Sequence, residues 1–406
     1  MTNEVSYLEV SMKIIRYKRV APHLKVENFG PIKGADVTFG DLTVCVGPQA
    51  TGKSILLQLL KLLVDTPHIK REFGRAGVDW QGQFLAFLDV YFGEGMRSLW
   101  KPETRIQLNA AAIDLPQRVE QSRSNRQEAM FFIPAQRVLA LRDGWPSAFN
   151  FYDASVPYTV REFSEQLRLL MSDFGAEGTL FPVPRRLKEE FRELLQEHIF
   201  PGFELKIDTQ RAQKRLVLTS KEKEGGSLPV AVWSAGQREF VPLLLGLYWL
   251  MVPAGAPRRR GVDWVVVEEL EMGLHPRAIS VVMLILFELM ARGYRVCIST
   301  HSPQVLDAIW ALQRLKEHGA SPPDLLRVFD VPQTPPLLQL AQEVMKRQAK
   351  VYYFDRSSGT TRDISSLNSS AEEAGESGWG GLTEFSGRAS TAVARAVANS
   401  RGKAQP

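Results

Sequence analysis

Residues 44–64 read V-C-V-G-P-Q-A-T-G-K-S-I-L-L-Q-L-L-K-L-L-V, and the architecture of the chain follows from them. A short apolar run of β-type residues, 42–46, leads into a glycine-flanked loop, and an almost wholly apolar helix is predicted after it. The loop, residues 47–54, fits G-x-x-x-x-G-K-[ST] at every fixed position. Because it stands between a strand and a helix, the pattern indicates a phosphate-binding loop more than a chance glycine-rich turn.

The predicted loop uses both its backbone and its side chains. Its N–H groups and the start of the helix form a concave anion site. Lys53 is expected to reach the β- and γ-phosphates, and the Ser54 hydroxyl to hold Mg²⁺. Gly47 and Gly52 are needed because a Cβ would block the loop's backbone shape and its approach to a phosphate. The predicted ligands are therefore ATP and Mg²⁺, bound by Gly47, Pro48, Gln49, Ala50, Thr51, Gly52, Lys53 and Ser54.

The composition is that of an ordinary globular protein that can bury a large core: 406 residues, 44% hydrophobic and 23% charged. Cys45 and Cys297 lie in strand-like apolar runs and suit neither a metal site nor a disulfide framework. Residues 1–20 show no secretory signal and are interpreted as a short strand or a flexible lead. The longest apolar run, 240–252, is too short to span a bilayer. We expect a cytoplasmic protein without membrane contact, whose net charge of +5 permits contact with nucleic acid without requiring it.

Periodicity divides the chain into a core in two parts, an inserted lobe and a tail. Residues 23–39 alternate around Gly30-Pro31 and predict a hairpin, which precedes the buried strand 42–46 and a helix to about residue 64. From 65 to 225 the pattern is mixed, and we interpret this interval as an inserted α+β lobe. Its predicted elements are strands over 80–92, 104–115 and 130–133, a polar loop over 120–128, helices over 160–174 and 186–198, and a strand pair, 203–208 with 215–219, closed by the turn-prone K-E-G-G at 223–226.

The second part of the core opens with W-S-A-G-Q-R-E-F at residues 233–240 and a strongly apolar helix to residue 250. Further predicted elements are strands over 264–267, 294–299 and 326–329, helices over 278–291 and after residue 303, and a hairpin of 351–354 with 361–364. From about residue 366 serine, alanine and glycine dominate, which predicts a flexible tail, disordered or ordered only by a partner. The predicted divisions are 1–64 with 226–365, 65–225, and 366–406.

Two acidic residues follow the apolar run at 265–267, and a histidine follows the run at 294–299. Buried parallel strands present ligand-binding groups at their carboxyl ends. A Mg·ATP site needs one carboxylate for the metal and another to activate water, so we assign Glu268 to Mg²⁺ and Glu269 to the water as general base. The alternative is that Glu268 and Glu269 merely begin a helix, where acidic residues favour the N-terminal dipole. The phosphate loop upstream makes this alternative less favoured. His301 is a candidate to hydrogen-bond a γ-phosphate, although a lone histidine is more often structural.

Taken together, four motifs resemble those of ABC-type ATPases. They are G-P-Q-A-T-G-K-S (Walker A), W-S-A-G-Q (signature), V-V-V-E-E-L-E-M-G-L-H-P (Walker B and D-loop) and I-S-T-H-S-P (switch histidine). The combination is similar to the soluble AAA branch that includes the ATPase half of the overcoming-lysogenization-defect (OLD) nucleases, related to RecF and the structural-maintenance-of-chromosomes proteins. The resemblance covers residues 22–64 and 228–365 well, and 65–225 only loosely.

The resemblance implies an α/β P-loop NTPase fold with a mixed sheet, an ABC-type ATPase head. It also implies a head-to-tail homodimer or higher oligomer. In that dimer, the signature residues of one subunit, Ser234, Ala235, Gly236 and Gln237, would cap the γ-phosphate held by Lys53 of the other. Ser234 with Gln237 can equally be an ordinary helix N-cap, and both roles are compatible. Gln136, at the end of the predicted strand 130–133, is a candidate Q-loop residue that contacts Mg²⁺.

The sequence departs from the family pattern at several positions. Gln49-Ala50 replaces the usual Asn-Gly, Glu268 replaces the commoner Asp, and Leu270 stands where Pro is usual, which we expect to loosen the turn after Glu269. The chain carries no Toprim-like acidic cluster after the ATPase motifs, so a nuclease or other effector would be a separate protein.

The sequence leaves three functions open. The first is an ATP-hydrolysing molecular switch that controls an effector or a DNA transaction, for which the resemblance suggests prokaryotic anti-phage defence. The second is the nucleotide-binding subunit of a membrane transporter, which G-L-H-P at the D-loop and the long insertion disfavour. The third is a scaffold that holds ATP without hydrolysing it, which Glu269 and His301 disfavour. Two basic clusters, 258–260 and 346–350, are more typical of solvated surfaces than of nucleic-acid contacts.

Overall fold

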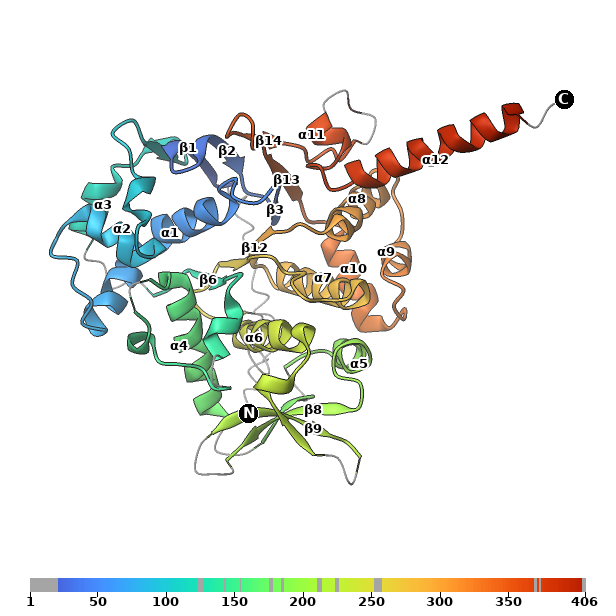
Figure 1. Ribbon diagram of the computed structural model, residues 1–406. Helices are drawn as coiled ribbons and strands as arrows, with labels where there is room; N and C mark the ends of the chain where they lie inside the picture. The colour runs from blue at the N-terminus through green and yellow to red at the C-terminus, as the bar shows by residue number, and fades with distance from the viewer. Residues whose placement is uncertain are drawn as a thin grey trace, which may run out of the picture.

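A six-stranded sheet forms the centre of the computed structural model, in the order β14-β13-β3-β12-β11-β6 (Figure 1). The structure describes residues 21–122, 127–141, 144–153, 155–174, 178–183, 186–209, 214–222, 226–251, 258–368, 371 and 374–403. The strands of this sheet are β3 (Leu42–Val46), β6 (Met130–Ile133), β11 (Trp264–Val267), β12 (Arg295–Ser299), β13 (Ala349–Phe354) and β14 (Thr361–Asp363). All neighbours pair in parallel except β13 with β14. The predicted α/β fold with a mixed sheet is confirmed.

Two smaller antiparallel sheets flank the centre. One has the order β2-β1-β4-β5 and the other β10-β9-β8-β7. Their strands are β1 (His23–Phe29), β2 (Ile32–Thr38), β4 (Arg105–Leu108), β5 (Ala111–Ala112), β7 (Gly178–Phe181), β8 (Phe203–Asp208), β9 (Arg215–Ser220) and β10 (Ser227–Pro229). The helices are α1 (Lys53–Arg75), α2 (Phe84–Phe92), α3 (Leu115–Gln121), α4 (Tyr158–Asp173), α5 (Glu189–His198), α6 (Ala235–Leu250), α7 (Pro276–Ala291), α8 (Pro303–Glu317), α9 (Pro322–Val328), α10 (Pro335–Val344), α11 (Ala374–Ser377) and α12 (Glu384–Lys403).

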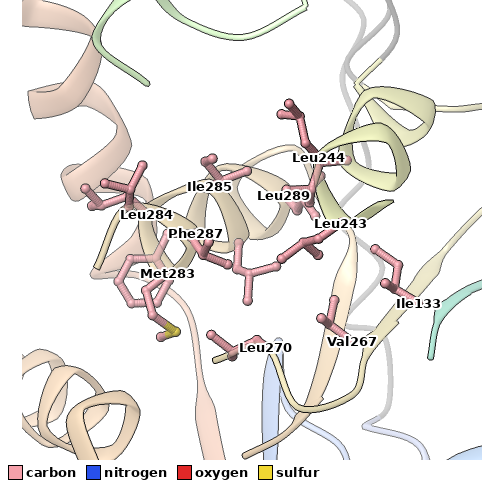
Figure 2. Packing of buried hydrophobic residues seen from close by; sticks show 14 of the residues in the cluster. Ile133, Leu243, Leu244, Val267, Leu270, Met283, Leu284, Ile285, Phe287 and Leu289 are labelled. Atoms are coloured by element: carbon pink, nitrogen blue, oxygen red, sulfur yellow. The ribbon is translucent and has the colours of Figure 1, made fainter. Parts of the chain in front are cut away.

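The central strands are buried on both faces, which explains their near-continuous apolar sequences. Alternate residues enter two different cores. Cys45, Val266 and Cys297 pack with α1 and the β1–β2 hairpin on one face. Val267 and Ile133 face the other side, where Figure 2 shows them in one cluster with residues of α6 and α7. The sheet therefore lies between α1 with the β1–β2 hairpin on one face and α6 with α7 on the other.

Two predicted strands are helices. Residues 80–92 contain α2, which buries Phe87, Leu88, Tyr91 and Phe92, a helical spacing that the short apolar run concealed. Residues 326–328 form the end of α9 and Phe329 is its C-cap, while a capping box of Ser321 and Asp324 fixes the start of the helix. The stretch 104–115 holds only the short pair β4 and β5, after which α3 begins and extends into the predicted polar loop.

The helix after the phosphate loop is longer than predicted. It bends at Asp65 (φ −117°, ψ 19°) and continues past Pro67 to Arg75. Proline cannot donate to the carbonyl of Leu63, and that carbonyl instead accepts a bond from Arg118 Nη2 at 2.7 Å. A side chain from α3 therefore satisfies the acceptor that would normally end the helix at the proline.

The predicted flexible tail contains helix. Alanines and arginines, which favour helices, recur through α12, and Figure 1 shows this helix projecting from the body of the molecule. Phe385 and Val393 on it are exposed. The expected lead over residues 1–20 and most of the expected turn at 223–226 lie outside the described residues. In the ranges that the structure describes, no helix is long and apolar enough to cross a membrane.

A buried network of charges lies at the bend of α1. Lys61 Nζ, fully buried, contacts Asp65 Oδ2 at 2.9 Å, Glu128 Oε1 at 2.7 Å and Glu162 Oε2 at 3.1 Å. The same ammonium donates to the Met130 carbonyl of β6 at 2.6 Å. His68 contacts Glu162 at 2.6 Å. One cation thus joins α1, the start of β6 and α4.

Replacing Lys61 with Met should lower the free energy of unfolding by about 3–5 kcal/mol, because three carboxylates lose the buried cation between them. The measurement is urea unfolding at pH 7. Lys346→Met is the matched control: this half-exposed lysine pairs with Glu343 on the surface, so its loss should cost less than about 0.5 kcal/mol. Equal losses in the two variants would contradict the prediction.

The pH dependence of stability should depend on Glu128. Burial raises the pKa of this carboxyl to about 7, against the opposing charge of Lys61. A raised carboxyl pKa stabilises the folded state at low pH, and that contribution is lost as pH rises through about 7. Glu128→Gln should therefore gain stability relative to wild type, on the order of 2 kcal/mol, between pH 5 and pH 8. Urea unfolding at both pH values tests this. The exposed Glu120→Gln should follow wild type, and a Glu128→Gln curve parallel to wild type would refute the assignment.

Candidate nucleotide site

Three predicted motifs meet at one edge of the central sheet because β3, β12 and β11 are adjacent and parallel. The phosphate loop follows β3, Glu268 and Glu269 follow β11, and His301 follows β12. Backbone bonds join these ends: Thr300 N–H donates to the Cys45 carbonyl at 3.1 Å, and Glu269 N–H to the Ser299 carbonyl at 2.9 Å. The carboxyl edge of a parallel sheet is where α/β proteins bind ligands.

Close packing leaves no space for a side chain at the two glycines of the phosphate loop. Gly47 has φ 137°, and a Cβ there would lie 2.5 Å from the Phe354 carbonyl oxygen. Gly52 has φ 96°, and its Cβ would lie 2.6 Å from Ile32 Cγ1. Ala50, where the family usually has glycine, adopts a left-handed φ of 61° at some cost in strain.

Lys53 is folded back onto its own loop. Its Nζ donates to the carbonyls of Gly47 at 2.8 Å and Pro48 at 2.7 Å. Burial lowers the pKa of this ammonium, and the nearby carboxylates of Glu269 and Glu271 oppose that effect. The cation is held at the mouth of the loop by two neutral acceptors, which a phosphate can replace.

Glu268 has the chemistry of a magnesium ligand. Its Oε2 accepts the Ala135 N–H at 3.2 Å, while Oε1 is buried with no hydrogen-bond partner among the described residues. Burial raises the pKa of Glu268 to about 7, and a hydrogen bond with the Ser54 hydroxyl acts to lower it. An orphaned carboxylate oxygen beside a hydroxyl suits Mg²⁺, which takes oxygen ligands. The residues present therefore fit the metal.

Glu269 sits in a constrained turn. Its backbone has φ 44°, a left-handed conformation that costs a non-glycine residue about 1–3 kcal/mol. Its N–H donates to both the carbonyl and the hydroxyl of Ser299, at 2.9 Å and 3.2 Å. Leu270, where proline is usual, is fully buried and packs in the core of Figure 2. The expected loosening of this turn is offset by that burial and by the bonds to β12.

His301 is tied to the D-loop by Glu271, which the sequence reasoning missed. The Glu271 carboxylate accepts the Thr300 hydroxyl at 2.9 Å and also the His301 N–H. Burial and the charge of Lys53 lower the pKa of the imidazole, against the opposing charges of Glu269 and Glu271. The only sequence signal was a third acid two residues beyond Glu269.

The signature segment starts α6. Ser234 Oγ accepts the Gln237 N–H at 3.2 Å, and Gln237 Oε1 accepts the Ser234 N–H at 3.1 Å, so the capping-box interpretation is confirmed. Ser234 and Ala235 are exposed. A Cβ on Gly236 would lie 2.8 Å from the Gly273 carbonyl oxygen of the D-loop. Within the described chain, the side chains of Ser234 and Gln237 each accept from the backbone N–H of the other residue and not from the phosphate loop of the same subunit.

Arg137, the residue after the Q-loop candidate Gln136, makes a set of buried hydrogen bonds. Gln136 is exposed, next to Ala135, whose N–H binds Glu268. Arg137 is fully buried and donates to the carbonyls of Glu268 at 2.9 Å, Glu269 at 3.1 Å and Glu239 at 3.1 Å. Sequence reasoning missed Arg137, since only its neighbour matched a motif. The metal role of Gln136 stays a prediction.

Gly47→Ala should weaken ATP binding at least tenfold, because the added methyl group collides with backbone that no side-chain rotation can move. Titration with a fluorescent ATP analogue measures the change. Gly74→Ala is the matched control: a Cβ there meets nothing within 4 Å, and alanine favours a helix. Affinity should be unchanged in the control, and wild-type affinity in Gly47→Ala would remove the loop from the site.

Comparison with solved structures returns distant likenesses. The SMC head domain from Thermotoga maritima is 13% identical, with 70% of this chain and 90% of that chain covered and a TM-score of 0.32. A dimeric bacterial ABC transporter cassette, MJ0796, is 12% identical, with 70% and 89% covered and a TM-score of 0.31. The Smc head domain with an extended coiled coil from Pyrococcus furiosus, bound to the C-terminal domain of ScpA, is 10% identical, with 84% and 96% covered and a TM-score of 0.36.

No curated protein matches the sequence. A family match covers residues 81–307, more than half of the chain. This interval holds the signature segment, Glu268 and Glu269, and His301, and it begins after the phosphate loop. The chain belongs to the family described as "AAA domain, putative AbiEii toxin, Type IV TA system".

Proposed function

We propose that the protein is an ATP-binding and ATP-hydrolysing molecular switch. The observation that carries the proposal is the buried, unpartnered Oε1 of Glu268 beside Ser54, at the edge where Lys53, Glu269 and His301 also converge. The Ala135 N–H bonds Oε2 of this carboxylate, whereas Oε1 is buried without a donor, which costs free energy that a bound cation would offset. A carboxylate that holds a metal keeps an oxygen available for it.

In this proposal the phosphate loop binds the nucleotide. Lys53 exchanges the carbonyls of Gly47 and Pro48 for the β- and γ-phosphates, and the backbone N–H groups of the loop complete the anion site. Ser54 and Glu268 hold Mg²⁺, which neutralises phosphate charge when bound. Full ionisation of Glu268 is then favoured by the cation, since its pKa of about 7 reflects burial.

Glu269 acts as the general base for the attacking water. Its constrained turn fixes the direction of the side chain, and it is half-buried at the open edge of the sheet. His301, whose pKa is lowered by burial and by Lys53, can hydrogen-bond the γ-phosphate through its imidazole. The Glu271 carboxylate of the D-loop accepts the His301 N–H. A movement of His301 on loss of the phosphate would therefore also move the D-loop.

The proposed switch is a head-to-tail homodimer. Ser234 and Ala235 are exposed at the N-terminus of α6, where a hydroxyl and backbone N–H groups suit the γ-phosphate of a second subunit. ATP would close the dimer and hydrolysis open it, with the state passed to a separate effector. Anti-phage defence, through an OLD-like partnership, is the biological setting that the family name and motifs favour, and it rests on analogy.

Direct binding of nucleic acid has less support. Arg258 pairs with Asp263 at 2.7 Å, Lys346 with Glu343 at 2.6 Å and Lys350 with Asp363 at 3.0 Å. These basic side chains are engaged within the chain. The effector is therefore proposed as a protein.

Glu269→Gln should lower kcat for ATP hydrolysis by about 10²–10⁴-fold, because the amide cannot take a proton from water. The same variant should accumulate as a dimer with Mg·ATP, as measured by light scattering, while wild type returns to its starting mass. Glu317→Gln, on the exposed end of α8, is the matched control and should behave like wild type. Undiminished turnover in Glu269→Gln would exclude it as the base. A mass that ignores ATP in every variant would replace the switch with a static assembly.

A further inference from the structure

Arg137 lies where three functional segments meet. It starts a short 3₁₀ turn (Arg137–Leu141) after β6 and has no exposed surface. Its Nη1 donates to the Glu268 carbonyl at 2.9 Å and its Nη2 to the Glu269 carbonyl at 3.1 Å. Its Nε donates to the Glu239 carbonyl at 3.1 Å. The carbonyls of Glu268 and Glu269 belong to the turn after β11, which carries the proposed metal ligand and general base. The Glu239 carbonyl belongs to α6, the helix that starts at the signature segment.

A packing role alone does not account for this arginine. Burying a guanidinium is costly, and its nearest carboxylate oxygen, Glu239 Oε2, is 3.5 Å away with no hydrogen bond of its own. Apolar side chains would pack the same space at lower cost. What the arginine supplies is a rigid, planar fork that holds three backbone acceptors at fixed relative positions, which lysine cannot do.

The turn held by this fork is strained. Glu269 has φ 44°, and such a conformation persists only where its surroundings enforce it. Ser299 fixes the N–H side of the residue, and Arg137 fixes the carbonyl side. Without the guanidinium, the carbonyl of Glu269 is released from α6, and the side chain on that turn loses its set direction.

The other end of the connection is the signature segment. Glu239 lies on the first turns of α6, directly after Ser234 to Arg238. Gly236 and the D-loop Gly273 are in backbone contact, since a Cβ on either would lie 2.8–3.3 Å from a carbonyl of the other segment. Leu243 of α6 packs in the same cluster as Val267 of β11 (Figure 2). A displacement of the N-terminus of α6 is therefore transmitted to the residues around Glu269.

We infer that Arg137 is a positioning residue that couples the signature segment to Glu269 within one subunit. The inference rests on the proposed head-to-tail dimer, in which the signature serves the partner's nucleotide while Glu269 serves the subunit's own. Engagement of Ser234 at one ATP would then set the base at the other ATP. The two sites of the dimer would hydrolyse in a coordinated manner through this guanidinium.

The first test needs no nucleotide: hydrogen exchange of the apo protein, compared between wild type and Arg137→Gln. Exchange should accelerate in two separate segments, residues 235–241 and 268–275, by roughly tenfold or more, since charge-assisted bonds are lost at both. Arg186→Gln is the matched control, because Arg186 donates to the Tyr248 carbonyl (2.9 Å), near the end of α6 that lies opposite the signature segment. It should leave residues 268–275 unchanged. Acceleration in one segment alone, or uniformly over the chain, would overturn the coupling.

The second test is a double-mutant cycle on kcat. Ser234→Ala should cost about tenfold in wild type and about threefold in Arg137→Gln, because the direct contact of Ser234 with the partner's γ-phosphate persists while its effect on Glu269 is lost. Arg137→Lys, which keeps the charge but loses the fork, should resemble Arg137→Gln, with ATP affinity within threefold of wild type. Additive effects would overturn the inference. Absent turnover in wild type would instead refute the proposed hydrolysis, and hydrogen exchange would then decide the coupling by itself.

Discussion

The structure depends on the parallel alignment of three buried strands, β3, β12 and β11. Their register pairs Ser299 with Cys45 and Val267 with Ile298, so the chain leaves all three strands at the same level. The phosphate loop, the two carboxylates and the histidine come from distant parts of the sequence, and this register alone brings them together. A slip in any one pairing would move a functional group along the strand by a residue and turn the strand's side chains to the opposite face.

The sequence was informative where one physical requirement dominates. Strands buried on both faces must be apolar throughout, so β3, β6, β11 and β12 could be predicted directly, and glycine punctuation located the phosphate loop. The nine-residue α2 and the end of α9 were misassigned because a short apolar run suits either a strand or a helix, and only tertiary packing selects one.

Buried charges were beyond sequence reasoning for a different reason. Lys61 looked like one polar residue in an apolar helix, because its partners Glu128 and Glu162 are 67 and 101 residues away by their numbering. Arg137 binds backbone carbonyls, which every residue carries and which leave no trace in the sequence. The two buried cations are stabilised in different ways. Lys61 is neutralised by carboxylates and stabilises the fold, whereas Arg137 donates to peptide carbonyls and constrains the turn at Glu269.

The projecting helix α12 converts a small rotation of the body into a larger displacement of its far end. A helix of 20 residues is about 30 Å long, comparable to the diameter of a small domain. Such a rod magnifies rotation: a turn of the ATPase body by ten degrees or so would sweep its far end through roughly 5 Å, although the nucleotide edge itself moves little. In the proposed dimer, a dye pair placed on the far ends of the two α12 helices would therefore be a sensitive measure of how the two ATPase bodies rotate.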